Sequence, residues 1–339
     1  MRPLSIAALW LVWLLLVGAG LGPAAAQSPS VLKKEPTAKP AESKPAESKP
    51  AAAEVMRVVT AGAALHKPDK SIENLGRGTR IEVSKVRDAW IGGYALVGKA
   101  RVPGWILKQD LQAVPDQAAI EAAVAQLTAL GVAFERDADN LPHAATCEGA
   151  KLTDKDLTAF QPLVDLLELD LSGTAITGAG LKSIAGLIGL ERLHLDQTAV
   201  DDEGLESLAA LVNLTGLSLS ETKITDAGLK HLAGMKQIRV LNLGDTPITD
   251  QGLAYLAGMK GIETLTLSRT NIAGKGFSHF QDFQDLITLN LDGCGLGPKA
   301  LNNFHKLGKI RILRMYDALV PEEDVDALEK AVDGLAIFR

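Results

Sequence analysis

Residues 214–229 read LTGLSLSETKITDAGL, and residues 238–253 repeat the pattern 24 positions later as IRVLNLGDTPITDQGL. Outward from these stretches, an L-x-x-L-x-L run recurs every 24 residues without insertion or deletion. The runs start at Leu166, Leu190, Leu214, Ile238, Ile262, Leu286 and Ile310. The alternating Leu-x-Leu positions predict a short strand with one buried face. Self-similarity at a fixed period predicts a solenoid in which each turn stacks on its neighbours.

The second half of each repeat predicts a helix. Thr177, Thr225 and Thr249 are expected to cap these helices, with Asp226 and Asp250 favoured near the helix N-terminus. A small residue follows each strand, namely Thr174, Thr198, Thr222, Thr246, Thr270 and Cys294. Recurring glycines are expected to let each helix lie close to its own strand; they are Gly180, Gly204, Gly228, Gly252 and Gly276.

The period and the L-x-x-L-x-L-x-x-(Asn/Cys/Thr)-x-L core resemble the leucine-rich repeat family. The Thr-x-Ile-Thr-Asp-x-Gly-Leu pattern at residues 222–229 and 246–253 resembles its short bacterial class. This resemblance implies an α/β solenoid of about eight turns, with a concave face that contacts other proteins.

Residues 142–339 are predicted to form the repeats, and residues 116–141 an N-terminal cap. Capping is needed because a single turn buries too little apolar surface to be stable alone. Residues 116–130 have helical spacing and precede a short apolar run at 132–134. At the other end Val325, Leu328 and Val332 predict a last helix, and Leu335, Ile337 and Phe338 are expected to close the stack.

Residues 1–26 resemble a signal peptide, with Arg2, an apolar run from Leu4 to Leu21 and the small residues Ala24 and Ala26. An uncleaved anchor helix is the alternative, because the run approaches the length that spans a bilayer. Residues 27–54 carry a near-repeat of Lys-Pro-Ala-Glu-Ser and predict a disordered linker. The linker either gives the chain reach from an anchorage or is an inert tether.

Residues 55–115 change character, with short β-prone runs between glycine and proline turns. The runs at 58–60, 80–83, 90–91 and 105–107 predict a small all-β barrel. A Gly-Thr turn at 78–79 and a Gly-Trp pair at 104–105 resemble the bacterial SH3-like family. This resemblance implies a binding or spacing module, associated in that family with cell-wall or peptide ligands.

Trp90, Tyr94 and Trp105 are the candidate ligand platform of the SH3-like module. Flat aromatic rings give a large contact area at low cost in rotamer entropy. The alternative for Trp90 and Trp105 is that they fill the interior of the barrel.

The charge is distributed unevenly along the chain. Its 35 Lys and Arg against 41 Asp and Glu give a net −6, which argues against nucleic acid as a partner. Residues 116–339 hold 19 basic and 32 acidic residues, a net −13, whereas residues 55–115 hold 10 and 5, a net +5. A cationic protein partner of the solenoid is therefore favoured more than the overall charge suggests.

The exposed strand residues of the repeats are small, polar and mildly acidic, as solubility alone would require. Residues of the types that anchor protein interfaces are scarce among them. The candidate partner contacts are Arg192, His194, Arg269, Arg314 and Tyr316.

No metal or cofactor is predicted. Asp170, His194 and Asp196, with Glu148, lie on adjacent predicted strands, but a second histidine is missing. The sequence also lacks a nucleophile elbow, an H-E-x-x-H motif, a Walker loop and a G-x-G-x-x-G motif, so no enzyme is predicted.

Cys147 and Cys294 lie six turns apart, about 29 Å at ~4.8 Å per turn. A disulfide needs Cα atoms within about 7 Å. Two free thiols in the solenoid core are therefore predicted.

These features predict an exported, non-enzymatic binding protein that uses the concave face of the solenoid for protein–protein interaction. The alternative is a cell-wall or surface-associated structural module in which the SH3-like module binds the ligand. Both place the protein outside the cytoplasm, in the periplasm, on the cell surface or in the medium, with no membrane span once the signal is cleaved.

Overall fold

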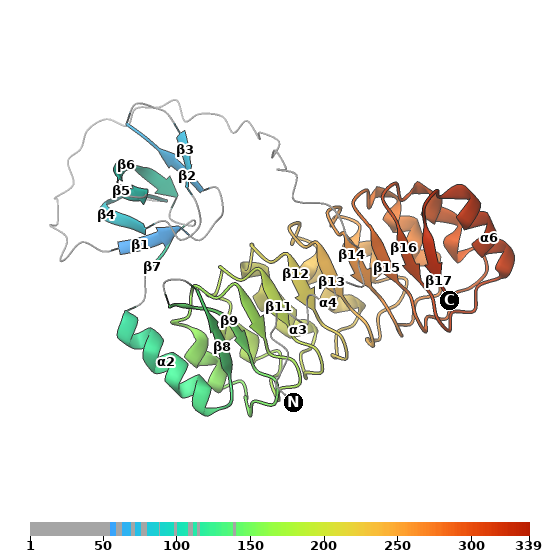
Figure 1. Cartoon of the computed structure of the whole chain (residues 1–339), viewed down its shortest axis with the longest axis horizontal. Helices are drawn as coiled ribbons and strands as arrows, with labels where there is room; N and C mark the ends of the chain where they lie inside the picture. The colour runs from blue at the N-terminus through green and yellow to red at the C-terminus, as the bar shows by residue number, and fades with distance from the viewer. Residues whose placement is uncertain are drawn as a thin grey trace.

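Figure 1 shows a computed structural model of the chain, with a ten-stranded sheet wound into a solenoid and a seven-stranded sheet earlier in the sequence. The structure describes residues 55–58, 63–68, 72–75, 80–87, 89–97, 100–107, 111–113, 116–137 and 140–339. The predicted signal peptide and linker, residues 1–54, lie outside these ranges, as do residues 59 and 60 of the first expected β run. Within them, no helix has the length and apolar character to cross a bilayer.

The strands of the solenoid lie side by side in chain order, from β8 to β17. β8 (Ala133–Arg136) pairs antiparallel with β9 (Pro142–Thr146), and the later pairs are parallel. The others are β10 (Glu168–Asp170), β11 (Arg192–His194), β12 (Gly216–Ser218), β13 (Val240–Asn242), β14 (Thr264–Thr266), β15 (Thr288–Asn290), β16 (Ile312–Arg314) and β17 (Ala336–Phe338). Leu169 lies opposite Leu193, and both are buried in one continuous core. The predicted strand at each Leu-x-Leu position is confirmed.

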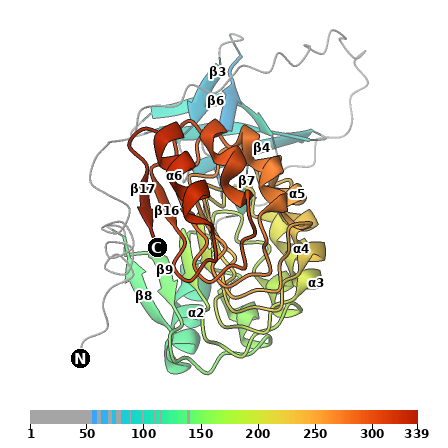
Figure 2. The same cartoon turned by 90° about the vertical axis from the view of Figure 1, so that its right-hand side faces the viewer.

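Short helical segments cover the side of the coil opposite the strands, as the view along the solenoid in Figure 2 shows. They are η2 (Asp156–Phe160), η3 (Gly180–Ser183), α3 (Asp202–Leu205), η4 (Glu206–Ala210), α4 (Asp226–Leu232), α5 (Leu253–Leu256), η5 (Lys275–Asp282) and η6 (Ala300–Lys306). The sequence predicted α-helices, but the segments labelled η are 3-10 helices. A 3-10 helix rises about 2.0 Å per residue, whereas an α-helix rises about 1.5 Å. Fewer residues of a 3-10 helix therefore cover the same length on the helical side of a repeat.

A buried hydrogen bond closes the bend after each of five strands. The threonine hydroxyl donates to the leucine carbonyl three residues earlier, at 2.6–2.7 Å, in Thr174, Thr198, Thr222, Thr246 and Thr270. Cys294 occupies the same position one turn later. Its Sγ donates to a carbonyl of the preceding turn, that of Leu267, at 3.0 Å. The recurring small residue is therefore a buried donor.

The residue before each of these positions has a left-handed backbone. This column contains Gly149, Gly173, Gln197, Glu221, Asp245, Arg269, Gly293 and Asp317, with φ between 53° and 75°. A non-glycine residue is uncommon in this region. The conformation aims the backbone N–H at the next turn, as where Gln197 N–H donates to the Ser220 carbonyl at 2.9 Å.

The repeat glycines make room between successive turns, which corrects the prediction that they bring each helix close to its own strand. A methyl group at Gly180 would lie 2.5 Å from Asp154 Oδ1, on the preceding turn. A methyl group at Gly228 would collide with the Asp202 carboxylate in the same way. Glycine stands here because the carboxylate of the previous turn occupies the space.

The repeat aspartates reach forward to the next turn. Thr225 caps α4 as predicted, since its hydroxyl accepts from Ala227 N at 3.2 Å. The Asp226 carboxylate, expected to interact with its own helix N-terminus, instead accepts from Thr249 N at 2.8 Å and Thr249 Oγ1 at 2.6 Å. Asp154 with Thr177, Asp202 with Thr225 and Asp226 with Thr249 make the same pair of bonds, and we call this set the Asp–Thr ladder.

Both ends of the core are covered by helices. α2 (Gln117–Ala129) is capped by the Asp116 side chain and buries Ile120, Val124 and Leu127 in the common core. α6 (Glu322–Ala331) covers the other end and precedes the edge strand β17. Phe338 was expected to close the stack but is 44% exposed, because its position in the strand points away from the leucine core.

The earlier sheet is antiparallel, with the strand order β3-β2-β6-β5-β4-β1-β7. Its strands are β1 (Val55–Val58), β2 (Ala63–His66), β3 (Ile72–Leu75), β4 (Arg80–Arg87), β5 (Trp90–Val97), β6 (Ala100–Leu107) and β7 (Leu111–Ala113). Its small core consists of Leu65, Leu75, Ile81, Val83, Ile91, Ala95 and Ile106. Among the described residues no strand pair joins β3 to β7, so the expected closure into a barrel is not seen there.

Candidate functional site

The face of the solenoid sheet that points away from the leucine core, here called the sheet face, is the predicted concave surface. Register places its side chains in columns, with Glu168 beside Arg192 and Asp170 beside His194. Its middle turns carry small residues such as Gly216. Larger polar and aromatic side chains therefore gather in two places, toward either end of the sheet.

The first cluster lies at the C-terminal end. Arg314 on β16 donates from Nε to Asp292 Oδ2 at 3.1 Å, and its Nη2 forms an ion pair with the same oxygen at 2.9 Å. Its guanidinium lies 5.5 Å from the centre of the Tyr316 ring. Asp292 Oδ1 also accepts from Tyr316 N at 2.8 Å. Phe338 is the register partner of Arg314, and the Tyr316 and Phe338 side chains remain 42% and 44% exposed. We call Asp292, Arg314, Tyr316 and Phe338 the Arg–Tyr cluster.

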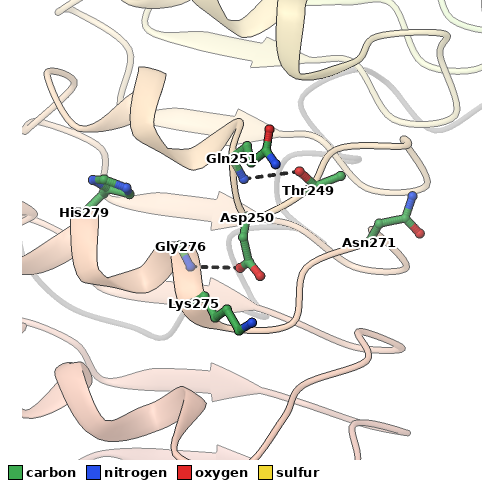
Figure 3. Close-up of a pocket in the computed structure, with 7 residues that line it drawn as sticks. All are labelled: Thr249, Asp250, Gln251, Asn271, Lys275, Gly276 and His279. Carbon is green, nitrogen blue, oxygen red and sulfur yellow. Dashed lines mark hydrogen bonds between the residues drawn. The ribbon is translucent and has the colours of Figure 1, made fainter.

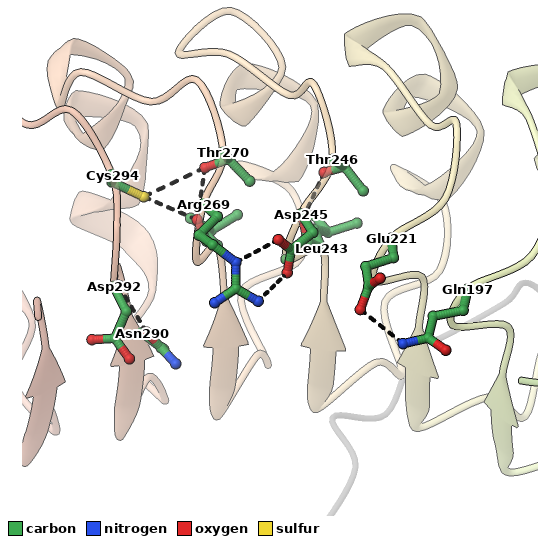
Figure 4. Close-up of polar contacts among 12 residues, drawn as sticks. Gln197, Glu221, Leu243, Asp245, Thr246, Arg269, Thr270, Asn290, Asp292 and Cys294 are labelled. Carbon is green, nitrogen blue, oxygen red and sulfur yellow. Dashed lines mark hydrogen bonds and ion pairs between the residues drawn. The ribbon is translucent and has the colours of Figure 1, made fainter. Parts of the chain in front are cut away.

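Arg269 does not join this cluster. It occupies a left-handed turn position, where its Nε and Nη2 each donate to the Asp245 carboxylate at 2.5 Å (Figure 4). Gln197 and Glu221 form a similar pair in the same column, with Nε2 donating to Oε1 at 2.9 Å. The structure therefore places Arg269 in a row of paired residues beside the strands.

The second cluster brings together two predicted contact residues, Arg192 and His194. Arg192 donates from Nε and Nη2 to Glu168 Oε2, at 2.8 and 2.5 Å, and the Glu168 side chain is only 5% exposed. His194 Nε2 lies 3.9 Å from the other oxygen, Oε1, which accepts no hydrogen bond within the described part of the chain. We call Glu168, Asp170, Arg192 and His194 the Glu168 cluster.

Asp196 lies beside the Glu168 cluster and links three turns. Its Oδ1 accepts from Ser218 Oγ at 2.5 Å and from Ser220 N at 2.8 Å, while Asn242 Nδ2 donates to the Ser218 hydroxyl at 3.0 Å. Burial raises the pKa of Asp196 above its ordinary value, although the hydrogen bonds from Ser218 and Ser220 oppose this. This chain of bonds keeps the small side chains of the middle turns in place.

Metal binding finds no support in the described residues. No group of three or more His, Cys, Asp and Glu side chains there has an arrangement that could hold a metal ion, including the carboxylates around His194. These side chains make hydrogen bonds with their neighbours, as where Asp170 Oδ1 accepts from Ser172 N at 2.9 Å.

A shallow hollow lies on the helical side, where the Asp–Thr ladder ends (Figure 3). Asp250 has no threonine partner and instead accepts from the backbone N–H groups of Ala273, Gly274 and Gly276 at 2.9–3.2 Å. The hollow has a volume of about 510 Å³ and is lined by Thr249, Asp250, Gln251, Asn271, Lys275, Gly276 and His279. Both oxygens of the Asp250 carboxylate accept backbone hydrogen bonds, so this carboxylate is not an unpaired group in the hollow.

Both cysteines are free and buried, as predicted. Burial, with a smaller contribution from the charge of Asp170, raises the pKa of the Cys147 thiol well above its usual range. Burial also raises the pKa of Cys294. The thiolate is the reactive form, so these thiols are structural.

The three predicted aromatic residues of the earlier sheet lie on its face opposite the small core. Trp90 and Tyr94 alternate along β5 with the buried residues of the small core. Trp105 lies on β6, where it is the register partner of Gly92 on β5. The Trp105 ring packs over Gly92, where a methyl group would come within 2.9 Å of it. His66 contacts the Trp90 ring edge-on, with centroids 4.9 Å apart. Trp90 and Trp105 are half-buried on this face, so they do not fill the interior as the alternative expected.

Sequence reasoning missed the partners of the predicted contacts. Glu168, Asp292 and Asp245 each hold an arginine on the following turn. A carboxylate 22 or 24 residues before an arginine was the available signal, because that spacing places two residues on adjacent strands.

Comparison with known proteins agrees with this geometry. The model of a family described as Leucine Rich repeat matches residues 165–185, 190–209, 211–233 and 237–257. A search of curated proteins finds no match.

Two solved structures are similar at low identity. An internalin (inlF) from Listeria monocytogenes is 18% identical, with a TM-score of 0.38, over 56% of this chain and 71% of that one. The LRR ectodomain of the plant membrane receptor kinase GASSHO1/SCHENGEN3 from Arabidopsis thaliana, in complex with CASPARIAN STRIP INTEGRITY FACTOR 2, is 16% identical, with a TM-score of 0.45. That match covers 60% of this chain and 27% of the ectodomain.

Residues 165–257 therefore carry leucine-rich repeats, and the parallel-stranded coil continues from them to β17 as a solenoid resembling that fold.

Proposed function

We propose that this chain is an exported, non-enzymatic binding protein that holds a protein partner on the sheet face of its solenoid. The observation that carries this proposal is the Arg–Tyr cluster. Arginine and tyrosine are enriched among the residues that dominate interface energetics. A single carboxylate, Asp292, orients the Arg314 guanidinium and holds the Tyr316 backbone, so the Arg314 side chain has less freedom to lose on binding.

The charge of the solenoid favours a cationic partner. Residues 116–339 carry a net −13, which attracts positively charged proteins and speeds their encounter at low ionic strength. Arg314 remains 37% exposed beside Asp292, so the cluster offers the partner both an acidic and a basic group.

The test is capture of native partners by the full chain and by an Arg314→Ala/Tyr316→Ala double variant. We expect the double variant to recover partners at least about tenfold less well, since central anchors each contribute about 2 kcal/mol or more. The matched control is Lys309→Ala/Tyr255→Ala, which removes one exposed cation and one exposed tyrosine outside the cluster. Equal recovery by both double variants would contradict the proposal.

The proposed organisation is a signal peptide at 1–26, a linker at 27–54, an SH3-like module at 55–115, a cap at 116–141 and short-class bacterial repeats at 142–339. It places the protein outside the cytoplasm, in the periplasm, on the surface or in the medium. Cell fractionation and the mass of the native protein test this, because a cleaved chain would begin near residue 27. A full-length mass in the membrane fraction would instead indicate a retained anchor.

A second candidate is a cell-wall or surface-associated structural protein, in which the SH3-like module binds the ligand. The side-by-side Trp90, Tyr94 and Trp105 on the face away from the core favour it, because such rings offer contact area at low entropic cost. Co-sedimentation of the full chain with purified cell wall is the measurement. Binding that is lost in Trp90→Ala/Tyr94→Ala but kept in Arg314→Ala/Tyr316→Ala supports this candidate, and absence of co-sedimentation removes it.

A further inference from the structure

Glu168 is a buried carboxylate with only one of its oxygens satisfied. Arg192 donates from both Nε and Nη2 to Oε2, whereas a bidentate arginine–carboxylate pair would use both carboxylate oxygens. Oε1 is buried and accepts no hydrogen bond from any described residue. An ionised carboxylate accepts bonds at both oxygens, and leaving one buried and unpaired costs free energy. The cluster is therefore one donor short.

The surroundings of Oε1 favour a donor with positive charge. Glu168 and Asp170 lie on β10 and Asp196 follows the end of β11, and Arg192 supplies one balancing charge. Asp170 uses Oδ1 to accept from Ser172 N, and its other oxygen accepts from no described residue. Acceptors on Glu168 and Asp170, two positions apart on β10, thus face the same side of the sheet.

We propose that the Glu168 cluster receives a lysine side chain of the protein partner, whose ammonium group donates to Glu168 Oε1 and to Asp170. This inference rests on the proposed protein-binding function of the sheet face and names the chemistry of the partner there. An ammonium group is compact and brings three donors with one charge. A planar guanidinium fits less well, because it favours two aligned carboxylate oxygens and Arg192 already holds Oε2.

His194 controls access to this site. Its Nε2 lies 3.9 Å from Glu168 Oε1, too far for a hydrogen bond, and its side chain is 26% exposed. The lysine enters when the imidazole swings aside, and a partly exposed side chain changes rotamer within nanoseconds. Removing the imidazole should therefore preserve or strengthen lysine binding, whereas removing either acceptor should weaken it.

The test measures fluorescence anisotropy of labelled Gly-Ser decapeptides with the full chain at low ionic strength. One peptide carries three lysines, a second carries three norleucines and a third carries three arginines. We expect the lysine peptide to bind most tightly and the norleucine peptide least. Glu168→Gln and Asp170→Asn should each weaken lysine-peptide binding about tenfold, and His194→Ala should not weaken it.

Glu206→Gln is the matched control, because it removes one exposed carboxylate from the helical side and should leave binding unchanged. Thermal melts followed by circular dichroism report whether each variant folds, and Asp170→Asn keeps the test decisive if Glu168→Gln unfolds. Equal binding of the lysine and norleucine peptides overturns the proposal. The proposal is also overturned if Asp170→Asn and folded Glu168→Gln both bind the lysine peptide with wild-type affinity. It is overturned as well if Glu206→Gln weakens binding of the lysine peptide as much as these two variants do.

The outcome separates this inference from the function on which it rests. If native partners are still lost in Arg314→Ala/Tyr316→Ala but are captured normally by folded Glu168→Gln, the lysine site is wrong and the binding function stands. If neither variant changes capture, the sheet face itself is not the binding surface.

Discussion

The first and second halves of the solenoid share one 24-residue period but join their turns differently. In the first half, up to Thr249, the Asp–Thr ladder joins three pairs of neighbouring turns, and it is interrupted where Gly178 and Asp201 take the two positions. Beyond Asp250, Ala273 stands where a threonine would continue the Asp–Thr ladder, and Asp250 binds backbone N–H groups instead. The buried helical positions change there from mainly leucine and isoleucine to Phe277, Phe280, Phe283 and Phe304.

Aromatic rings fill the helical side of the second half, and one ring pair joins two successive turns there. Phe280 and Phe283 stack with centroids 4.6 Å apart, and Phe277 meets Phe304 at 4.9 Å across two turns. The strand ladder and the leucine columns continue through both halves. The period is therefore maintained by the sheet, and the helical side tolerates either polar or aromatic contacts between turns.

The largest expected effect is on the aromatic half. Phe280→Ala should lower the free energy of unfolding by about 3–5 kcal/mol, because it empties a fully buried site whose ring contacts two others. Urea denaturation followed by circular dichroism measures this. Phe338→Ala, which removes an exposed ring, is the control and should cost much less. Similar losses in both would show that the buried ring adds no more stability than the exposed one.

Breaking the polar half should cost less. Asp226→Ala removes the acceptor for Thr249 N–H and Oγ1–H, and we expect a loss of about 1–3 kcal/mol. Asp333→Ala, at an exposed position near the C-terminus, should be close to neutral. If the Asp226 variant unfolds at the same urea concentration as wild type, the Asp–Thr ladder contributes no stability to the first half.

A third pair of substitutions compares the buried hydrogen-bond donor that follows the strand, which is Thr246 in the first half and Cys294 in the second. Thr246→Val removes the 2.6 Å hydrogen bond to the Leu243 carbonyl at nearly constant volume and should cost about 1 kcal/mol. Cys294→Val should cost less, because a thiol is a weak donor. Chemical denaturation of both variants measures the difference, and a larger loss at Cys294 would reverse this ranking.

The smallest effect is a change in pH dependence at Asp196, which lies 96 residues before its counterpart Asp292. Folding raises the pKa of Asp196, so the folded state holds this proton more tightly than the unfolded chain does. As the pH rises above about 4, ionisation favours unfolding, and the contribution of Asp196 to stability falls. Asp196→Asn cannot ionise, so its melting temperature minus that of wild type should increase from pH 4 to pH 7. Thermal melts across this range test it, with Asp333→Asn as control, and a constant difference would contradict it.

Sequence periodicity by itself determined the strands, the buried leucine columns, the Thr225 cap and the two buried thiols. Each follows from local rules, since a Leu-x-Leu alternation has one inward face and a threonine caps the residues that follow it. The number of stacked turns followed from counting the same period.

Only the tertiary structure decided which side chains of successive turns meet. Asp226 binds Thr249 instead of its own helix, Gly180 makes room for Asp154, and Glu168 keeps one oxygen without a donor. These contacts join residues about one period apart, and their partners depend on the offset of neighbouring turns and on side-chain rotamers. The physical reason is that stacking geometry is a property of the whole coil, whereas a repeat read alone specifies only its own strand and bend.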